Sequence, residues 1–280
     1  MVFGLLKRKK EVKAAPAPDV PRPELPDLGL RLDDDSRERL RKTKVFVIGC
    51  GPAGTEIAMH LAKAGIGGIG LSDNAFIEEK DIEGNLVFQP SHIGKRKSII
   101  LADHLKAMNP EISVFPSTAR MRYDNIMNAS RSCSIVIDCS GDLATHFLAS
   151  DACYLMEKRL VMLVESNVLV LDPKAGPCFR CIVNDLERSR TGRLGSLATI
   201  ETIDLVLGKS TAGKMFVSGM TKSLEKNADC DCSKGKITLI DYEKWLGKKA
   251  PESASAVLDK KTAVKSLASS ESKLSGASLE

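Results

Sequence analysis

Short apolar runs alternate with stretches of helical periodicity through the middle of the chain. The apolar runs fall at residues 45–48, 68–72, 112–116, 134–138 and 160–165, and the helical patterns at residues 54–64, 94–107 and 143–156. Apolar runs of this length, bounded by glycine or polar residues, predict buried strands. Strands that alternate with helices predict an α/β fold, in which a Rossmann-like, doubly wound and mostly parallel sheet carries helices on both faces.

Less regular segments flank this alternation. Residues 33–36 are three aspartates and a serine, which can cap a short basic helix over residues 37–43 ahead of the first strand. Toward the other end, residues 194–207 predict one amphipathic helix, and residues 236–240 predict a late strand.

The two ends of the chain differ from the middle in composition. Five prolines fall within residues 14–26, and residues 247–280 consist mainly of Ser, Ala, Lys and Glu with few large apolar side chains. A proline-rich stretch favours an extended tether, and a polar tail buries too little apolar surface to offset the entropy of ordering. We therefore expect a disordered arm over residues 1–32, one domain over residues 33–246 and a disordered tail over residues 247–280.

Composition narrows the classes of function. The 280 residues are 43% hydrophobic, so the chain can bury an ample core, whereas the net charge is only +5 and 4% of residues are aromatic. A long basic face with interleaved aromatics is therefore not expected, and nucleic acid is not an expected partner. Apolar runs fall short of the roughly 20 residues that span a bilayer, and residues 1–10 place an apolar patch before their charges, the reverse of a signal peptide. We expect a cytoplasmic protein without a membrane partner.

Candidate chemistry begins where the first predicted strand ends. Gly49, Gly51 and Gly54 permit a tight turn, a close approach of the backbone to phosphate and close packing of helix on strand. Asp73 follows the second predicted strand and can accept hydrogen bonds from ribose hydroxyls. The pattern predicts nucleotide binding at the carboxyl ends of the strands, and by itself it leaves an NAD-dependent oxidoreductase open.

The eight cysteines separate into two groups. Four stand alone in apolar or motif contexts, and four form a Cys-x-x-Cys and a Cys-x-Cys pair: Cys178 and Cys181, Cys230 and Cys232. Two such pairs are typical of metal ligation in a reducing compartment, where four thiolates hold structural Zn²⁺ tetrahedrally. The tighter Cys-x-Cys spacing leaves unligated structural or redox thiols as the alternative to this zinc knuckle.

Several segments resemble, in the family's order, the ubiquitin-activating (E1-like) superfamily, the group of MoeB, ThiF and HesA. They are residues 56–73, residues 85–90 with Gly94 and Lys97, and residues 108–110, 135–140, 178–181 and 195–197. The resemblance covers roughly residues 40–210. It implies a homodimer that binds Mg²⁺ and ATP and adenylates a carboxylate, with Lys97 in contact with the ATP phosphates.

The sequence departs from the family pattern at three places. Residues 82–85 lack the arginine that the family uses on the γ-phosphate, and Asp142 stands one residue away from the family's magnesium-binding aspartate. Residues 182–193, which correspond to the family's crossover loop, contain no cysteine for thioester or persulfide chemistry. The same loop carries Arg188, Arg190 and Arg193, any of which can supply charge to a phosphate.

These observations lead to a hypothesis and an alternative. We expect an E1-like adenylyltransferase with Lys97 and Asp142 as catalytic residues, which forms an acyl-AMP and passes it to a separate nucleophile. The acceptor is the C-terminus of a ubiquitin-like or sulfur-carrier protein, or a small-molecule carboxylate such as a cofactor precursor. The alternative is a catalytically degenerate E1-like scaffold that binds a nucleotide or a partner.

Overall fold

The computed structural model describes residues 31–165, 167–183, 186, 194–210, 212–217 and 220–246. Three sets of residues with sequence predictions lie outside these ranges. They are the tail over residues 247–280, the arm over residues 1–32 except its last two residues, and Arg188, Arg190 and Arg193. The predictions for those segments stay predictions.

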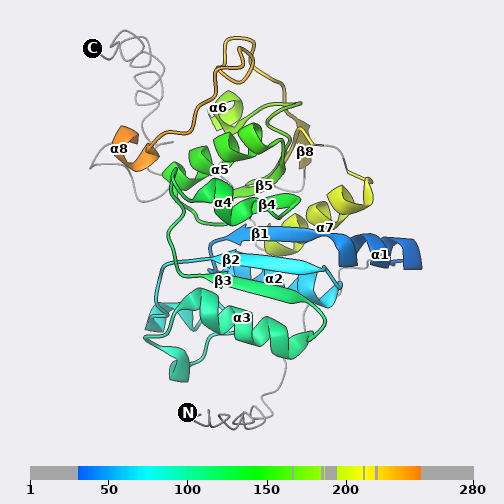
Figure 1. The fold of residues 1–280 in the computed structure, drawn as a ribbon, viewed down its shortest axis with the longest axis vertical. Coiled ribbons are helices and arrows are strands. Elements are labelled where there is room, and N and C mark those ends of the chain that lie inside the picture. The colour runs from blue at the N-terminus through cyan, green and yellow to red at the C-terminus, as the bar shows by residue number, and fades with distance from the viewer. Residues whose placement is uncertain are drawn as a thin grey trace, which may run out of the picture.

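One sheet of eight strands forms the centre of the molecule (Figure 1), in the order β3-β2-β1-β4-β5-β6-β7-β8. Its strands are β1 (Lys44–Ile48), β2 (Gly68–Ser72), β3 (Ser113–Ser117), β4 (Ile135–Asp138), β5 (Arg159–Val164), β6 (Asn167–Leu171), β7 (Lys214–Val217) and β8 (Met220–Ser223). The strands from β3 to β5 are parallel, and β6, β7 and β8 add to the β5 edge in antiparallel fashion. The chain runs outward in opposite directions from β1 and β4, so a topological switch point lies between these two strands.

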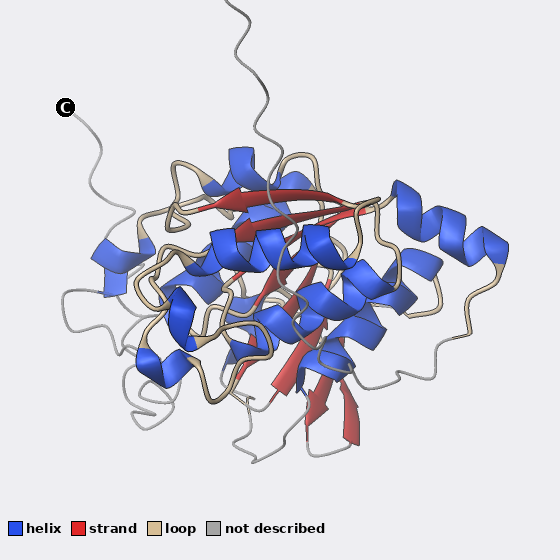
Figure 2. Cartoon of the chain, turned by 90° about the horizontal axis from the view of Figure 1, so that it is seen from below, coloured by secondary structure: helices blue, strands red, loops and turns tan. Residues whose placement is uncertain are grey.

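Helices cover both faces of the sheet, as Figure 2 shows from below. Side chains of β1 alternate between two cores: Val45 and Val47 face the first, and Phe46 and Ile48 face the second. The first core contains residues of α1 (Asp34–Lys42), α2 (Pro52–Lys63), α3 (Lys97–Met108) and α7 (Leu194–Leu207). The second contains residues of α4 (Ile126–Ser130), α5 (Leu143–Met156), α6 (Phe179–Ile182) and α8 (Tyr242–Leu246). The predicted doubly wound α/β fold is confirmed.

Most predicted elements agree with the structure to within a few residues. The helix predicted over residues 37–43 begins earlier, at Asp34, because the Asp33 carboxylate caps it by accepting from the Ser36 N–H at 2.9 Å. The helix predicted over residues 194–207 has those bounds. Its start lies against α2, where the Ser196 hydroxyl donates to Glu56 and where a Cβ on Gly195 would overlap the same carboxylate.

The late strand predicted over residues 236–240 is wrong. This segment is coil in the structure, and its alternating apolar residues serve packing instead of strand pairing. Ile237 is buried beside the paired cysteines, while Leu239 and Ile240 pack against the second core. The strands that complete the sheet are β6, β7 and β8, which the apolar pattern did not resolve into separate elements.

The short helix α8 is fixed to α5 by aromatic packing. Its Tyr242 ring stacks on Phe147 of α5 with the ring centroids 5.5 Å apart, and the Trp245 ring meets Phe147 edge-on at 6.1 Å. The Tyr242 hydroxyl donates to the buried Asp151 carboxylate, to which Arg180 also donates at 2.8 Å. Burial raises the pKa of Asp151 even though both donors act to lower it. These contacts join α5, α6 and α8 into one unit.

Candidate nucleotide and metal sites

The glycine turn between β1 and α2 has no room for other residues at two positions. Gly49 has φ +94°, and a Cβ there would lie 2.7 Å from the Cys139 carbonyl oxygen, while a Cβ on Gly54 would overlap the Gly49 carbonyl. Gly51 begins α2 as its N-cap and faces open space. The turn therefore brings strand and helix together at the N-terminal end of α2, where the positive end of the helix dipole suits phosphate.

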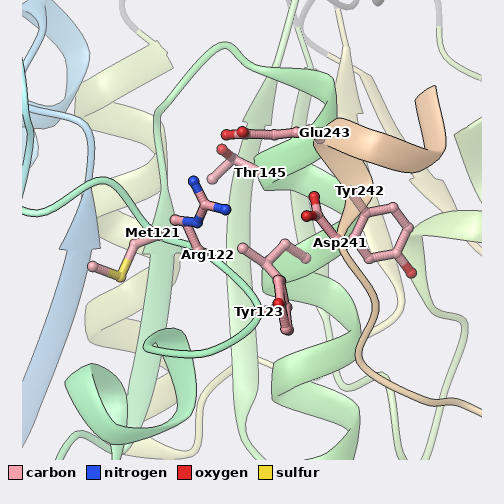
Figure 3. A pocket seen from close by; sticks show the side chains of 9 residues that line it. Met121, Arg122, Tyr123, Thr145, Asp241, Tyr242 and Glu243 are labelled. Atoms are coloured by element: carbon pink, nitrogen blue, oxygen red, sulfur yellow. The ribbon is translucent and has the colours of Figure 1, made fainter. Parts of the chain in front are cut away.

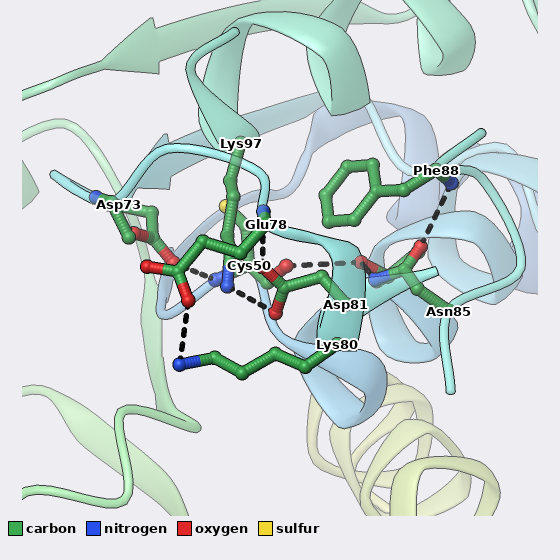
Figure 4. Close-up of polar contacts among 10 residues, drawn as sticks. Cys50, Asp73, Glu78, Lys80, Asp81, Asn85, Phe88 and Lys97 are labelled. Carbon is green, nitrogen blue, oxygen red and sulfur yellow. Dashed lines mark hydrogen bonds and ion pairs between the residues drawn. The ribbon is translucent and has the colours of Figure 1, made fainter. Parts of the chain in front are cut away.

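Asp73 ties the end of β2 to this turn. Its carboxylate accepts from the Cys50 N–H at 2.8 Å and from the Ala75 N–H at 2.7 Å. Figure 4 shows Asp73 pointing toward Cys50, across from the short 3-10 helix that carries Asp81. The carboxylate is thus held at the carboxyl end of β2, in the place that the sequence predicted for a ribose acceptor.

A cleft of about 440 Å³ lies over the carboxyl ends of β1, β2 and β4. Clefts of this size are typical of small-molecule sites, and this one lies at the switch point of the sheet. Among the predicted residues, its walls include Gly49, Gly51, Asp73, Lys97 and Asp142. Gly54 does not line the cleft, but its lack of a side chain allows α2 to pack closely on the glycine turn. The fold therefore brings the predicted nucleotide-site residues to one place.

Lys97, at the start of α3, is already paired in this cleft. Its Nζ lies 2.6 Å from Asp81 Oδ1, and each of the two side chains is only 12% exposed. Burial acts to raise the pKa of Asp81, but the hydrogen bond from Lys97 and the Glu78 N–H outweigh it, so that the pKa is lowered. Asp81 was not predicted, because it lies in a single 3-10 turn, Glu79–Asp81, which is too short to give a periodic signal. Figure 4 shows the pair beside Asp73.

Asn85 fixes the loop that precedes α3. Its side-chain amide donates to Thr55 Oγ1 of α2 at 2.9 Å, and its carbonyl oxygen accepts from the N–H groups of Val87 and Phe88. Phe88 is buried. The segment without the family arginine thus has a structural role in holding the loop against α2.

Asp142 lies in the cleft as the N-cap of α5. Its Oδ2 accepts from the Thr145 N–H at 3.0 Å and from the Thr145 hydroxyl at 2.6 Å, and the same atom lies 3.6 Å from an Arg120 nitrogen. All three contacts use one carboxylate oxygen. The remaining oxygen leaves Asp142 able to hold a hydrated Mg²⁺, which needs only one or two carboxylates.

Asp138 and His146 form a buried pair close to Asp142 in the chain. Asp138, at the end of β4, is completely buried and accepts from the Ser140 N–H at 3.0 Å. Its other oxygen lies 2.7 Å from His146 Nδ1 of α5. Sequence reasoning missed His146, which is also completely buried. The pair stiffens the turn between β4 and α5 and so positions Asp142.

The two cysteine pairs converge into one cluster. Its Sγ atoms lie within 4.8 Å of one another, with separations of 3.8 Å for Cys178–Cys181, 3.6 Å for Cys178–Cys230 and 3.5 Å for Cys181–Cys232. Four thiolates around Zn²⁺, with Zn–S bonds of about 2.3 Å at tetrahedral angles, stand about 3.8 Å apart. The Cys-x-Cys spacing is therefore no obstacle to the geometry. Four sulfurs leave no position for substrate, so a metal here has a structural role.

Buried surroundings support the cysteine cluster. Cys178 and Cys232 are buried together with Tyr154 and Ile237, and the Tyr154 hydroxyl donates to the Cys232 carbonyl at 3.2 Å. The hydrogen bond with Cys181 raises the pKa of the Cys178 thiol, and the same bond lowers the pKa of Cys181.

A second depression lies beside the cleft, under α8 (Figure 3). Met121 and Thr145 border both hollows, while Arg122, Tyr123 and Asp241 border only this one. Its volume of about 10 Å³ gives room for about one water molecule, so it is not a substrate site. Elsewhere, none of the helices in the described part of the chain is long and apolar enough to cross a membrane.

Comparison with known sequences gives one family and a set of relatives. The model of the ThiF family matches residues 27–253. The adenylyltransferase and sulfurtransferase MOCS3 of Culex quinquefasciatus is 30% identical over 244 residues, which cover 76% of this chain and 56% of that protein. The Xenopus laevis protein of the same name is 29% identical over 258 residues, covering 81% and 56%. The chain thus spans a little over half the length of these relatives.

Solved structures show the same fold. The crystal structure of E. coli MccB with ATP superposes with a TM-score of 0.58 at 18% identity, over 70% of this chain and 68% of that one. PaaA superposes with a TM-score of 0.55 at 18% identity, over 69% and 67%. At this level of identity the likeness concerns the fold.

Proposed function

The chain belongs to the ThiF family, and on this premise we propose that it activates a carboxylate by transferring AMP to it from Mg·ATP. One observation carries the proposal: a glycine turn, an aspartate and a lysine converge in a cleft at the switch point of the sheet. In the reaction a carboxylate oxygen attacks the α-phosphorus, pyrophosphate leaves, and an acyl-AMP forms. MOCS3 relatives bear the name adenylyltransferase, and MccB has been crystallised with ATP on the same fold, which supports this chemistry.

Each residue of the cleft has a role in this proposal. Asp73 accepts from the ribose hydroxyls, and the glycine turn at the N-terminal end of α2 faces the phosphates. Lys97 stabilises the negative charge that builds on phosphate oxygens during transfer, and Asp142 holds Mg²⁺ through coordinated waters. Positioning and charge stabilisation suffice, because phosphoryl and nucleotidyl transfer need little covalent help from a protein.

The acceptor belongs to one of two chemical classes. It is the C-terminus of a ubiquitin-like or sulfur-carrier protein, or a small-molecule carboxylate such as a cofactor precursor. Residues 182–193 contain no cysteine, so the acyl group passes from AMP to a nucleophile outside this loop. A protein acceptor accords with the names of the MOCS3 relatives, which include a sulfurtransferase activity.

Structural zinc and a homodimer complete the proposal. The sulfur separations in the cysteine cluster suit Zn²⁺, which would join the segment of Cys230 and Cys232 to that of Cys178 and Cys181. A second subunit would cover large apolar side chains that are exposed between β2 and the first turn of α3: Phe76, Leu86, Ile93 and Ile99. Light scattering of the full-length chain tests the dimer, and elemental analysis tests the metal.

Exchange of labelled pyrophosphate into ATP tests the reaction, with a panel of carboxylates that includes small proteins ending in Gly-Gly. Lys97→Ala should reduce exchange by about 10²-fold or more, as for loss of one group that stabilises transition-state charge. Lys95→Ala is the matched control, because Lys95 is exposed two residues away and does not line the cleft. Equal rates of exchange in the two variants would show that Lys97 has no role in the reaction.

The alternative is a catalytically degenerate scaffold. One observation favours it: Asp73, Lys97 and Asp142 each already have a protein partner. Binding of ATP without exchange for any acceptor would favour this alternative. Binding of NAD in preference to ATP would instead favour the oxidoreductase that the glycine turn alone leaves open.

A further inference from the structure

Arg120 is a cleft residue that the sequence patterns gave no reason to select. It follows β3, on the segment that crosses the carboxyl ends of the strands toward α4, and its side chain lines the cleft together with Lys97 and Asp142. The Arg120 carbonyl accepts from the Asn125 side-chain amide at 2.9 Å, so its backbone is anchored. Movement at this position is therefore movement of the side chain.

Two cations line the described part of the cleft, and their ion pairs differ in kind. Lys97 and Asp81 are each 12% exposed and lie 2.6 Å apart, so breaking this pair leaves a largely buried charge. Arg120 is 49% exposed; it lies 2.7 Å from Glu243 of α8 and 3.6 Å from Asp142. Pairs as exposed as these contribute little and exchange easily. Arg120 is accordingly the cation that can change partners when a ligand enters.

Binding of Mg·ATP would weaken both ion pairs of Arg120, the one with Asp142 and the one with Glu243. Asp142 is the proposed Mg²⁺ ligand, and a divalent cation there competes with the guanidinium for the carboxylate. A triphosphate offers Arg120 a bidentate anion of higher charge than Glu243. Glu243 is 40% exposed and becomes solvated when Arg120 leaves it.

We propose that Arg120 is a phosphate-binding residue of this cleft, which exchanges Asp142 and Glu243 for the triphosphate of Mg·ATP and thereby couples nucleotide binding to α8. The inference rests on the proposed ATP site and adds to it a residue from the same subunit. It supplies an arginine to a site whose residues 82–85 have none. Glu243 competes with the nucleotide for Arg120 and so weakens binding.

Calorimetric titration of the full-length chain with Mg·ATP tests this competition, because two variants that break one ion pair should change affinity in opposite directions. Arg120→Ala should weaken binding by about tenfold or more, the loss of a charge-assisted contact. Glu243→Gln should tighten binding by about two- to fivefold, because Arg120 is then released in advance. Arg122→Ala is the matched control, since Arg122 has the same charge but does not line the cleft.

A purely structural ion pair gives a different pattern. Both variants would then lower the melting temperature alike and shift the affinity in the same direction, which would overturn the inference. Unchanged affinity in Arg120→Ala would do the same, and Arg120→Lys, which keeps the charge, should retain part of the affinity. Absence of Mg·ATP binding by the wild-type chain would overturn the proposed function and this inference together, whereas normal wild-type binding isolates the failure to Arg120.

Discussion

The cleft that we propose binds a nucleotide and the cysteine cluster that we propose binds zinc differ in the partners that their polar groups already have. In the cleft, each charged group already has a protein partner: Asp73 has two N–H groups, Lys97 has Asp81, and Asp142 has Thr145. In the cluster, the sulfurs have mainly one another, at separations of 3.5–3.8 Å. Four thiols with a metal's spacing and a buried setting gain most of their stabilisation from an ion.

Because of this difference, we expect the cluster to affect folding and the cleft to affect binding. The cleft should keep its shape without a nucleotide, because backbone N–H groups and an ion pair maintain it. The cluster should lose its shape without a metal, since it joins α6 to a coil segment around Cys230 that has no strand pairing to hold it. Variants of the cluster should therefore reduce stability, and variants of the cleft should chiefly reduce affinity for Mg·ATP.

The largest effect is expected from loss of the proposed zinc. Cys232→Ser should remove zinc and lower the free energy of unfolding by more than about 4 kcal/mol, because ligation free energy is coupled to folding. A chelator should act likewise on the wild-type chain. Metal content and urea unfolding provide the measurements, and Cys133→Ala, at a buried cysteine outside the cluster, should keep its metal. Full stability of metal-free protein would break the comparison.

The next effect is expected at the glycine turn, where the cleft depends on close packing of the backbone. Gly54→Ala should cost about 3 kcal/mol of stability and most of the affinity, because its Cβ overlaps the Gly49 carbonyl. Gly51→Ala meets no atom within 4 Å and should fold normally while weakening Mg·ATP binding where phosphate approaches the turn. Thermal unfolding and calorimetry of both variants check this, and equal stability losses would contradict it.

A charge in the cleft should affect binding more than folding. Asp73→Ala should weaken Mg·ATP binding by roughly 1–3 kcal/mol, the value of a hydrogen bond to a charged group together with its unpaired partners. Its stability should change less, since water in the open cleft can satisfy the freed N–H groups. Asp124→Ala, an exposed carboxylate outside the cleft, serves as the control. Unchanged affinity in Asp73→Ala would exclude this residue from the site.

The smallest effect is a pH dependence. The pKa of Asp81 is lowered from its ordinary value of 3.8 in the folded chain, so the pair with Lys97 stabilises the fold above that value. This contribution is lost as the pH falls through the folded pKa, and it should not change between pH 5 and pH 8. Urea unfolding of wild type and of the double variant Asp81→Asn, Lys97→Met should differ at neutral pH and converge on acidification by about 1 kcal/mol. A difference in unfolding free energy that stays constant with pH would contradict this prediction.

Local chemistry explains what could be predicted from the sequence. The five parallel strands are short apolar runs, of which β1, β4 and β5 bury side chains in both cores. Gly49, Gly51, Gly54 and Asp73 lie within one strand–turn–helix–strand unit. Their roles follow from backbone conformation and spacing alone. The Cys-x-x-Cys and Cys-x-Cys pairs likewise predict a cluster, although only the fold shows that the four sulfurs lie close together.

Contacts between distant segments explain what could not. Asp81, Arg120 and Glu243 are polar residues in irregular or short segments, and their ion pairs join parts of the chain that have no common periodicity. The strand predicted over residues 236–240 failed because alternation of apolar residues only requires one buried side, which packing on helices satisfies as well as pairing does.

The only tryptophan of the chain lies on α8, two residues beyond Glu243. Trp245 is half-buried, with its ring centroid 5.7 Å from that of Tyr242 and 6.1 Å from that of Phe147. All tryptophan emission from this protein therefore comes from one indole on the helix that carries Glu243, the ion-pair partner of Arg120. A shift of α8 toward solvent would redden that emission, so the native chain carries an intrinsic fluorescent reporter for movement of this helix, with no added label.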